Sequence, residues 1–287
     1  MLQANKKVAA IHDLSGVGRC SLSVILPTLS VMGVQACSVP TAVLSSHTGG
    51  LGNCVFHDLT DYVSEALCHY KELELEFDCV YSGFLGSENQ ITHCVEFLES
   101  YPHALAVVDP VMGDHGKPYK TYTPAMCRRM GELACKADLI TPNLTEAFML
   151  LGEEYPTAPL TVSEAKRALV KLSGFGPKFV IITGVEMADG NMSNLGYDRE
   201  QNAFWRVDCR YVPVSYPGTG DIFASVVVGS LLKGDSLPMA IDRATEFLEL
   251  CIKTTYGYGT DTRMGVMLES CLFWLTEEQT LTRYTGM

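Results

Sequence analysis

Apolar and polar residues alternate in two different patterns along most of this chain. Short continuous apolar runs, each about as long as a buried strand, are separated by longer stretches with apolar residues at helical spacing. Strands are predicted at residues 8–11, 35–39, 79–82, 105–109, 139–141 and 179–183. Helices are predicted between them, at residues 21–32, 57–72, 88–101, 124–136, 144–151 and 163–173. This alternation is typical of β-α-β units around a largely parallel sheet, so an α/β fold is predicted.

The pattern changes in the C-terminal third of the chain. Residues 193–212 are extended in character, with charged or aromatic residues at intervals, and predict two or three antiparallel strands. Further helices are predicted at residues 222–232, 237–255 and 265–275, and the tail at 276–287 is expected to be poorly ordered. Because no repeat, low-complexity tract or Pro/Ser-rich linker interrupts the sequence, residues 1–287 are predicted to form a single domain.

The composition limits the partners of the protein. A chain of 287 residues, of which 47% are hydrophobic, can bury a large core. Its formal net charge of −12 disfavours nucleic acid and anionic membranes as partners, because both would require a basic face. The 11 cysteines form no Cys-x-x-Cys pair, and the sequence has neither a secretory signal nor an apolar stretch of about 20 residues. These features predict a reduced, cytoplasmic protein.

The most informative motif is the run Pro217-Gly-Thr-Gly-Asp221, which directly precedes an apolar helix. Its glycines let the backbone approach an anion closely, and the free N–H groups of a helix N-terminus attract phosphate. Asp221 would be placed to accept a proton from an attacking hydroxyl group. The motif therefore predicts a phosphoryl-transfer site with Gly218, Thr219, Gly220 and Asp221 as catalytic residues. The simpler alternative is that Thr219 or Asp221 only caps the helix.

Polar side chains also follow several predicted strands directly. In an open α/β sheet, ligands bind at the carboxyl ends of the strands, so these residues are candidates for a site. Three carboxylates at such positions, Asp109, Asp114 and Glu146, would allow a hydrated Mg²⁺ to bridge the protein and a triphosphate. The alternative is that they cap helices or are solvated in loops. Together with the phosphate-attracting helix, they favour a site for a nucleotide and a metal ion.

Several other enzyme classes are not supported by the sequence. The run Gly-x-x-x-x-Gly-Lys-Ser/Thr of P-loop kinases is absent, as is the motif set of protein kinases. The segment Gly16-Val-Gly-Arg-Cys-Ser21 lacks the third glycine of a dinucleotide-binding loop. The 7 histidines show no His-x-x-x-His spacing, so no catalytic zinc site is predicted.

With these motifs placed, the chain resembles the ribokinase-like superfamily over nearly its whole length, and within it the vitamin B6 kinases. The resemblance rests on five segments: Ser45-Ser-His-Thr48, Ser82-Gly-Phe-Leu-Gly-Ser87, Asp109-Pro-Val-Met-Gly-Asp114, Thr141-Pro-Asn-Leu-Thr-Glu146 and Gly218-Thr-Gly-Asp221. It implies a three-layer α/β/α fold, with a mostly parallel central sheet and a short antiparallel edge. It also implies ATP-dependent phosphorylation of the 5′-hydroxymethyl group of pyridoxal, pyridoxamine or pyridoxine, with Asp221 as general base.

The resemblance further assigns roles to individual residues. The vitamer would be bound by Asp13, Ser15, His47, Thr48, Phe84 and Asp221. ATP would be bound by Asp109, Asn143, Glu146, Thr183, Gly184 and Thr219. Metal ions would be held by Asp109, Asp114, Thr141, Glu146 and Thr183, with Mg²⁺ near Asp114 and Glu146 and a monovalent ion, K⁺ or Na⁺, near the other three. Residues 116–122 would form a mobile flap over ATP, and the protein would be a homodimer.

Three positions depart from the pyridoxal kinase pattern. Asp13 and Leu14 stand where many pyridoxal kinases have Ser and His, and Phe84 replaces a tyrosine. Asp13 would bind a protonated pyridine nitrogen or a ring hydroxyl, but Asp13-Leu-Ser-Gly also looks like the Asp-Pro-Ser-Gly of hydroxymethylpyrimidine kinases. Those enzymes typically have Cys at the position of Asp221, which favours the B6 vitamers.

Three alternatives stay open at this point. They are a hydroxymethylpyrimidine (phosphate) kinase of thiamine synthesis, a sugar or nucleoside kinase of the same fold, and a non-catalytic protein that binds a B6 vitamer. The apolar character of residues 39–44 disfavours a sugar, and the presence of Asp221 with the metal carboxylates disfavours a non-catalytic role. Cys20, which follows the first strand closely, is expected to be a packing residue.

Overall fold

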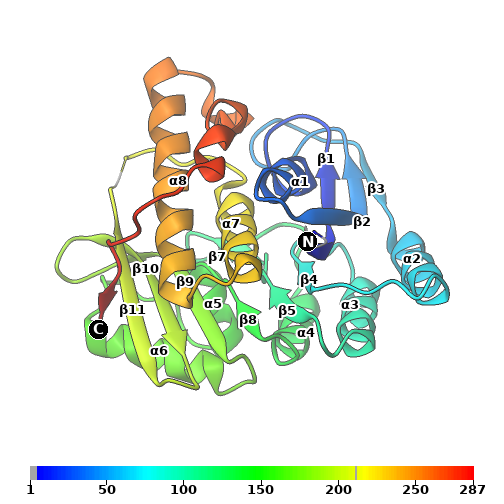
Figure 1. Cartoon of the computed structure of the whole chain (residues 1–287), viewed down its shortest axis with the longest axis horizontal. Helices are drawn as coiled ribbons and strands as arrows, with labels where there is room; N and C mark the ends of the chain where they lie inside the picture. The colour runs from blue at the N-terminus through cyan, green and yellow to red at the C-terminus, as the bar shows by residue number, and fades with distance from the viewer. Residues whose placement is uncertain (1–4, 211) are drawn as a thin grey trace.

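A ten-stranded sheet runs through the molecule in the order β12-β11-β10-β9-β8-β5-β4-β1-β2-β3 (Figure 1). The structure is a computed structural model that describes residues 5–210 and 212–287, so residues 1–4 and Tyr211, in the predicted antiparallel segment, lie outside it. The six central strands are parallel, and each lies at a predicted position. They are β1 (Lys7–Ser15), β2 (Gln35–Leu44), β4 (Cys79–Ser82), β5 (Leu105–Val108), β8 (Leu139–Ile140) and β9 (Phe179–Glu186).

Antiparallel strands flank this centre on both sides. The predicted antiparallel segment forms two strands, and the end of the chain adds a third beside them: β10 (Met192–Asp198), β11 (Ala203–Cys209) and β12 (Thr285–Gly286). On the opposite edge, β3 (Phe56–Asp58) pairs with β2. The prediction of a helix from residue 57 is wrong here, because the helix begins only at Thr60, whose N–H donates to the Asp58 carboxylate at 2.8 Å. A separate two-stranded sheet joins β6 (Gly113–Asp114) and β7 (Lys117–Pro118).

Helices cover both faces of the sheet, which gives the three layers of the expected fold (Figure 1). One face carries α2 (Thr60–Glu72), α3 (Glu88–Ser100), α4 (Pro124–Ala134), α5 (Leu144–Leu151) and α6 (Val162–Ser173). The other carries α1 (Leu22–Val31), α7 (Thr219–Lys233) and α8 (Leu237–Tyr258). Both helical layers pack on apolar residues of the same strands. In β1, for example, Val8 and Ala10 face one core while Ala9 and Ile11 face the other. Within the part of the chain described, no helix is both long and apolar enough to cross a membrane.

The C-terminal segment differs from its prediction. The helix predicted at residues 265–275 is wrong: the segment forms short 3₁₀ turns, η2 (Leu268–Ser270) and η3 (Leu272–Thr276), after a first turn η1 (Thr262–Met264). Gly265 has φ 74°, which a regular α-helix cannot include, and the N–H of Met267 donates to the hydroxyl of Thr255 on α8 at 2.7 Å. Packing against α8 therefore replaces helical hydrogen bonding.

The tail, which was expected to be poorly ordered, makes specific contacts in the structure. Arg283 donates to the Glu249 carboxylate at 2.8 Å, and its N–H donates to Asp242 at 2.8 Å. These contacts, together with the pairing of β12 with β11, fix the end of the chain against α8 and the sheet. The sequence pattern of the tail is polar, but the partners of Arg283, Asp242 and Glu249, lie 41 and 34 positions earlier.

Candidate active site

The candidate site lies where the C-terminal ends of the parallel strands meet the start of α7. Asp221, in the first turn of α7, lies 3.0 Å from His12 near the end of β1, and it accepts a hydrogen bond from the N–H of Ser21 at 2.7 Å. The backbone of Phe84, after β4, approaches the same imidazole at 3.3 Å. The fold thus brings together two predicted strand ends, those of β1 and β4, and the glycine-rich run.

No side chain caps the N-terminus of α7. Gly218 has φ 78°, and a side chain there would collide with the carbonyl oxygen of Arg19, so glycine is required on both grounds. Thr219 donates its hydroxyl to the carbonyl of Tyr216 at 3.1 Å, and the carboxylate of Asp221 is directed to Ser21. The simpler interpretation, in which Thr219 or Asp221 caps this helix, is therefore not supported, and the first amides stay available to an anion.

The carboxylate of Asp221 is held at both oxygens. Oδ1 lies 3.0 Å from Nε2 of His12, and Oδ2 accepts the Ser21 N–H; the side chain is 12% exposed. Burial acts to raise the pKa of Asp221, but the charge of His12 and the hydrogen bonds from His12 and Ser21 outweigh it and lower the pKa. Asp221 is therefore an ionised carboxylate in a fixed orientation, as a proton acceptor requires.

His12 is a site residue that the sequence analysis did not select. Its Nδ1 lies 3.0 Å from Asp13, so the imidazole has a carboxylate at each nitrogen. Burial disfavours the charged ring, but the charges of Asp221 and Asp13 and the hydrogen bonds to both raise the pKa of His12 to about 10. The only signal in the sequence was a histidine at the end of a buried strand, since its partner lies more than 200 positions away.

The other substrate candidates on the first strand lie beside this pair. Asp13 is buried, and Ser15 donates its hydroxyl to the second carboxylate oxygen of Asp13 at 3.1 Å. Cys20 is buried, and its burial together with the charges of Asp221 and Asp13 raises the pKa of the thiol to about 12. Cys20 is thus a neutral packing residue, as expected, and not a nucleophile.

His47, Thr48 and Phe84 lie on two further loops. The ring of His47 is buried; it lies 2.6 Å from the carbonyl of Arg263 at Nε2 and accepts the Gly49 N–H at Nδ1, so it ties loops together. Thr48 is exposed. Phe84 is half-buried and packs edge-on against Tyr122 at 6.4 Å between ring centroids. Of these three residues, Phe84 forms a hydrogen bond to His12, through its backbone N–H.

Asp109 lies at the end of β5, the strand beside β4. It is buried, and burial together with the charge of Asp221 raises the pKa of Asp109 to about 7, against the opposing influence of His12. The hydroxyl of Thr141, at the end of the neighbouring β8, is buried; it lies close enough to Asp109 to lower the pKa of that carboxyl, but it has no hydrogen bond of good geometry among the described residues. A buried carboxyl group with a raised pKa and a buried hydroxyl oxygen are both suitable ligands for a cation. A bound cation would stabilise the ionised carboxylate and coordinate the hydroxyl oxygen.

Glu146 and Asn143 form a capping box at the start of α5. Asn143 accepts the Glu146 N–H at 3.0 Å, while Glu146 accepts N–H groups from Asn143 at 2.8 Å and from Met112 at 3.1 Å. Asn143 also donates to the carbonyl of Gly113 at 2.9 Å. Burial and the charge of Asp109 raise the pKa of Glu146 well above its usual range, against the hydrogen bonds that favour the charged form. Both residues therefore shape the loop that carries Asp114.

The remaining predicted ligands lie on neighbouring loops. Asp114 is exposed on β6, and Thr183 lies on β9 next to Gly184, whose φ is 63°. Thr183 forms a bridge with Asn143, so the ends of β8 and β9 are adjacent. Among the described residues, no three His, Cys, Asp or Glu side chains are placed to hold a metal ion together. A divalent ion here would need ligands from water or phosphate.

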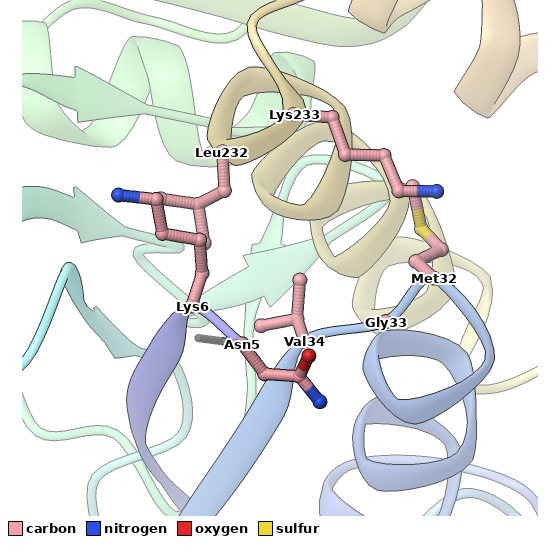
Figure 2. A pocket seen from close by; sticks show the side chains of 7 residues that line it. All are labelled: Asn5, Lys6, Met32, Gly33, Val34, Leu232 and Lys233. Carbon is pink, nitrogen blue, oxygen red and sulfur yellow. The ribbon is translucent and has the colours of Figure 1, made fainter. Parts of the chain in front are cut away.

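A cavity of about 290 Å³ lies at the far end of α7 (Figure 2). Its lining includes Lys6, Met32 and Lys233. Figure 2 shows the amino groups of Lys6 and Lys233 pointing away from each other, and Lys6 pairs with Asp78 at 2.8 Å. Because α7 separates it by roughly 20 Å from the first turn of that helix, this cavity is not part of the candidate site.

The fold and the arrangement of these residues define a kinase of the ribokinase-like class. A family model described as phosphomethylpyrimidine kinase matches residues 25–265, and the chain belongs to that family. The chain is 30% identical over 238 residues to the chloroplast thiamine biosynthetic bifunctional enzyme of Arabidopsis thaliana, covering 82% of this chain and 44% of that enzyme. The chain therefore spans less than half the length of this relative.

Two solved structures are similar over almost the whole chain. A candidate phosphomethylpyrimidine kinase from Bacteroides thetaiotaomicron, in a crystal form with pyridoxal, is 46% identical with a TM-score of 0.94, covering 99% of this chain and 100% of that chain. Pyridoxal kinase from Lactobacillus plantarum is 32% identical with a TM-score of 0.87, covering 95% of this chain and 97% of that chain. These similarities confirm the predicted resemblance to B6 kinases and to the ribokinase-like fold, and they include relatives of both substrate classes.

Proposed function

We propose that this kinase transfers the γ-phosphoryl group of ATP to the 5′-hydroxymethyl group of a B6 vitamer: pyridoxal, pyridoxamine or pyridoxine. The observation that carries the proposal is the ionised Asp221, fixed at both oxygens beside the uncapped start of α7. In an in-line transfer, the hydroxyl oxygen bonds to the γ-phosphorus while the bond to ADP breaks. Asp221 accepts the hydroxyl proton, and the amides of Gly218, Thr219 and Gly220 stabilise the charge on the transferring oxygens.

Asp13 supports a nitrogen heterocycle as the acceptor. It is a buried carboxylate whose neighbours are Ser15 and His12, and a ring N–H or ring hydroxyl would be a suitable further donor. His47, Thr48 and Phe84 would complete the ring pocket from the neighbouring loops. The 46% identical Bacteroides protein crystallised with pyridoxal, which supports a B6 vitamer as the substrate of this chain.

Hydroxymethylpyrimidine is the second candidate substrate. It carries the same kind of primary alcohol on a nitrogen ring, and both the family description and the run Asp13-Leu-Ser-Gly favour it. Asp221 in place of the usual Cys favours the vitamer. A protein that binds a vitamer without turnover would have little need for an ionised carboxylate beside an open helix start.

The nucleotide and its ions are part of the same proposal. ATP would lie along the start of α7 and the loops after β5, β8 and β9, near Asp109, Asn143, Glu146, Thr183 and Gly184. Mg²⁺ would be held through water by Asp114 and Glu146, since both Glu146 oxygens already accept N–H groups, and it would supply neutralisation of the phosphate charge. Asp109, Thr141 and Thr183 offer the carboxylate and hydroxyl oxygens that suit K⁺ or Na⁺.

The protein is further proposed to act as a homodimer. Phe56 on the edge strand β3 is 40% exposed, Val55 just before this strand is 59% exposed, and Val43 on the adjacent β2 is 40% exposed. An exposed apolar strand edge favours pairing with another copy. Light scattering during gel filtration is expected to give twice the chain mass, and Phe56→Glu should shift the protein to the monomer. A wild-type monomer at micromolar concentration would contradict this proposal.

The substrate is tested by ADP release with Mg-ATP against pyridoxal, pyridoxamine, pyridoxine and hydroxymethylpyrimidine. We expect the B6 vitamers to be turned over with much higher kcat/KM than the pyrimidine. Turnover of the pyrimidine alone would show that the pyrimidine, and not a B6 vitamer, is the substrate. The assignments of the protein as a kinase and of Asp221 as the base would then still hold. Tight binding of a vitamer without ADP release would support the non-catalytic role.

A further inference from the structure

The imidazole of His12 connects two carboxylates with different proposed tasks. Nδ1 lies 3.0 Å from Oδ1 of Asp13, and Nε2 lies 3.0 Å from Oδ1 of Asp221. The outer carboxylate oxygens are also occupied, by the hydroxyl of Ser15 at 3.1 Å and the N–H of Ser21 at 2.7 Å. One buried row of hydrogen bonds therefore runs from the group proposed to bind the substrate ring to the group proposed to accept its proton.

The surroundings of His12 leave its ring no second position. The side chain is 2% exposed, and it packs edge-on against Tyr81 at 6.3 Å between ring centroids. Any side chain at Gly83 would collide with the ring, so only a glycine fits at this position beside His12. The N–H groups of Asp13 and Phe84 approach Nδ1 and Nε2 at 3.1 Å and 3.3 Å, slightly farther than the carboxylates.

The titratable groups around the ring are negative or neutral. Asp13 comes from β1, Asp221 from α7 and Asp109 from the end of β5, while the Tyr81 phenol on β4 and the Cys20 thiol carry no charge at neutral pH. Two carboxylates, those of Asp13 and Asp221, therefore contact the ring, while Asp109 interacts with it only through charge, and no cation among the described residues counts among the influences on its pKa. This environment favours an imidazole that carries a proton on each nitrogen and donates to both neighbouring carboxylates.

Building on the proposed function, we propose that His12 is a positioning residue, which orients Asp221 through Nε2 and Asp13 through Nδ1. Its two nitrogens then have separable effects. The Nε2 contact sets the rate of phosphoryl transfer, because it fixes the proton acceptor against the attacking hydroxyl. The Nδ1 contact sets the affinity for the acceptor, because it fixes the carboxylate that meets the ring.

Two amide substitutions separate these contacts. The Gln side chain places an N–H donor near the position of Nε2, and the Asn side chain places one near the position of Nδ1. His12→Gln should keep kcat near the wild-type value and raise KM for the acceptor about 10- to 100-fold, which is the typical effect of losing one charge-assisted hydrogen bond. His12→Asn should lower kcat by a similar factor and leave this KM near the wild-type value. KM for ATP should stay unchanged in both.

Controls separate positioning from a merely structural role. His12→Leu removes both donors and should show both defects, while His93→Gln, on α3 and away from the site, should show neither. Thermal melts of all variants report folding. If His12→Gln and His12→Asn change kcat and KM in the same way, the proposed division of tasks is wrong, even where His12→Leu fails to fold.

A second readout is independent of turnover. Nitrogen-15 NMR of the histidine side chains should show His12 protonated at both ring nitrogens at pH 8, and a neutral His12 ring would contradict the proposal. If wild-type protein turns over none of the four acceptors, the proposed function fails while this spectrum still tests the hydrogen-bonded row. If it turns over an acceptor but the two amide variants behave alike, only the inference about His12 fails.

Discussion

The two ends of α7 contrast in how they treat the backbone groups that every helix leaves unpaired. At the C-terminal end, Gly234 adopts φ 95° and its N–H donates to the carbonyl of Leu231, while the N–H of Asp235 donates to that of Ser230, so the helix is closed by its own chain. At the N-terminal end, Gly218 also adopts a positive φ, but no side chain caps the first turn. Glycine therefore closes the helix at its C-terminal end, whereas at the N-terminal end it leaves the first backbone N–H groups accessible to a ligand.

The ionisable groups follow the same contrast. Asp221, His12, Asp13 and Asp109 gather at the start of α7; the last three are buried, and the side chain of Asp221 is 12% exposed. At the other end, the lysines of the cavity point apart and Lys6 is neutralised by Asp78 (Figure 2). The proposed functional end of α7 is therefore identified by its unpaired backbone groups and its ionisable side chains. The cavity lies at the opposite end of the helix.

Replacing the glycines at the two ends of α7 should give the largest difference in effect between the ends. Gly218→Ala places a methyl group against the Arg19 carbonyl and should displace the start of α7, which lowers kcat about 100-fold. Gly234→Ala, where a side chain meets no atom within 4 Å, should cost only about 1–2 kcal/mol of stability for its left-handed backbone. Steady-state kinetics and chemical unfolding of both variants measure the two effects. Equal kinetic defects would contradict the distinction between the ends.

The buried charge of Asp109 predicts a pH-dependent stability. The pKa of Asp109 rises from 3.8 to about 7 on folding, so folding is favoured while this group is protonated. Its contribution is complete below the unfolded-state pKa and is lost as the pH rises through about 7. Asp109→Asn, which resembles the protonated form, should therefore raise the free energy of unfolding at pH 8 by up to about 3 kcal/mol and change it little at pH 4.

Unfolding by urea in buffer without K⁺, Na⁺ or Mg²⁺ measures this difference, because a bound cation would stabilise the ionised carboxylate. Glu164→Gln is a suitable control, since Glu164 is a half-buried capping carboxylate on α6, away from the site. A gain in stability for Asp109→Asn that is the same at pH 4 and pH 8 would contradict the assignment of the charge to Asp109.

The smallest effect is expected at the cavity end of α7. Lys233→Ala removes a lysine that lines the cavity about 20 Å from Asp221, so kcat and KM should stay within error of the wild-type values. Stability should change by no more than about 0.5 kcal/mol. A marked change in kinetics would mean that the two ends of the helix are coupled, and the contrast between them would have to be redrawn.

The sequence predicted the parts of the fold that rest on continuous local patterns. Six apolar runs became the six parallel strands, and residues 144–151 became α5 with its capping box. The segment at 265–275 has apolar residues at nearly helical spacing, but Gly265 and the contact with Thr255 decide its conformation. The polar tail was expected to be poorly ordered because its partners, Asp242 and Glu249, cannot be found by spacing.

The candidate site was predictable to the same extent. Residues that directly follow strands were found, because the end of a strand is itself a local feature. His12 was missed, since its importance depends on lying between Asp13 and Asp221, which the fold alone brings together. The hydrogen bond from the Asn143 N–H to Glu146 could have been expected from the spacing of a capping box, but the second one, from the Met112 N–H, could not.

The most direct test of the account is the effect of Asp221→Asn on vitamer-dependent ADP release, with ATP affinity measured by calorimetry on the same preparations. Asn keeps the shape of the side chain but cannot accept the hydroxyl proton as a carboxylate does. We expect kcat to fall about 10²- to 10⁴-fold, the usual contribution of a positioned general base, with the Kd for ATP nearly unchanged. Near-normal turnover in this variant would contradict the assignment of Asp221 as the base, and with it the central claim about the open end of α7.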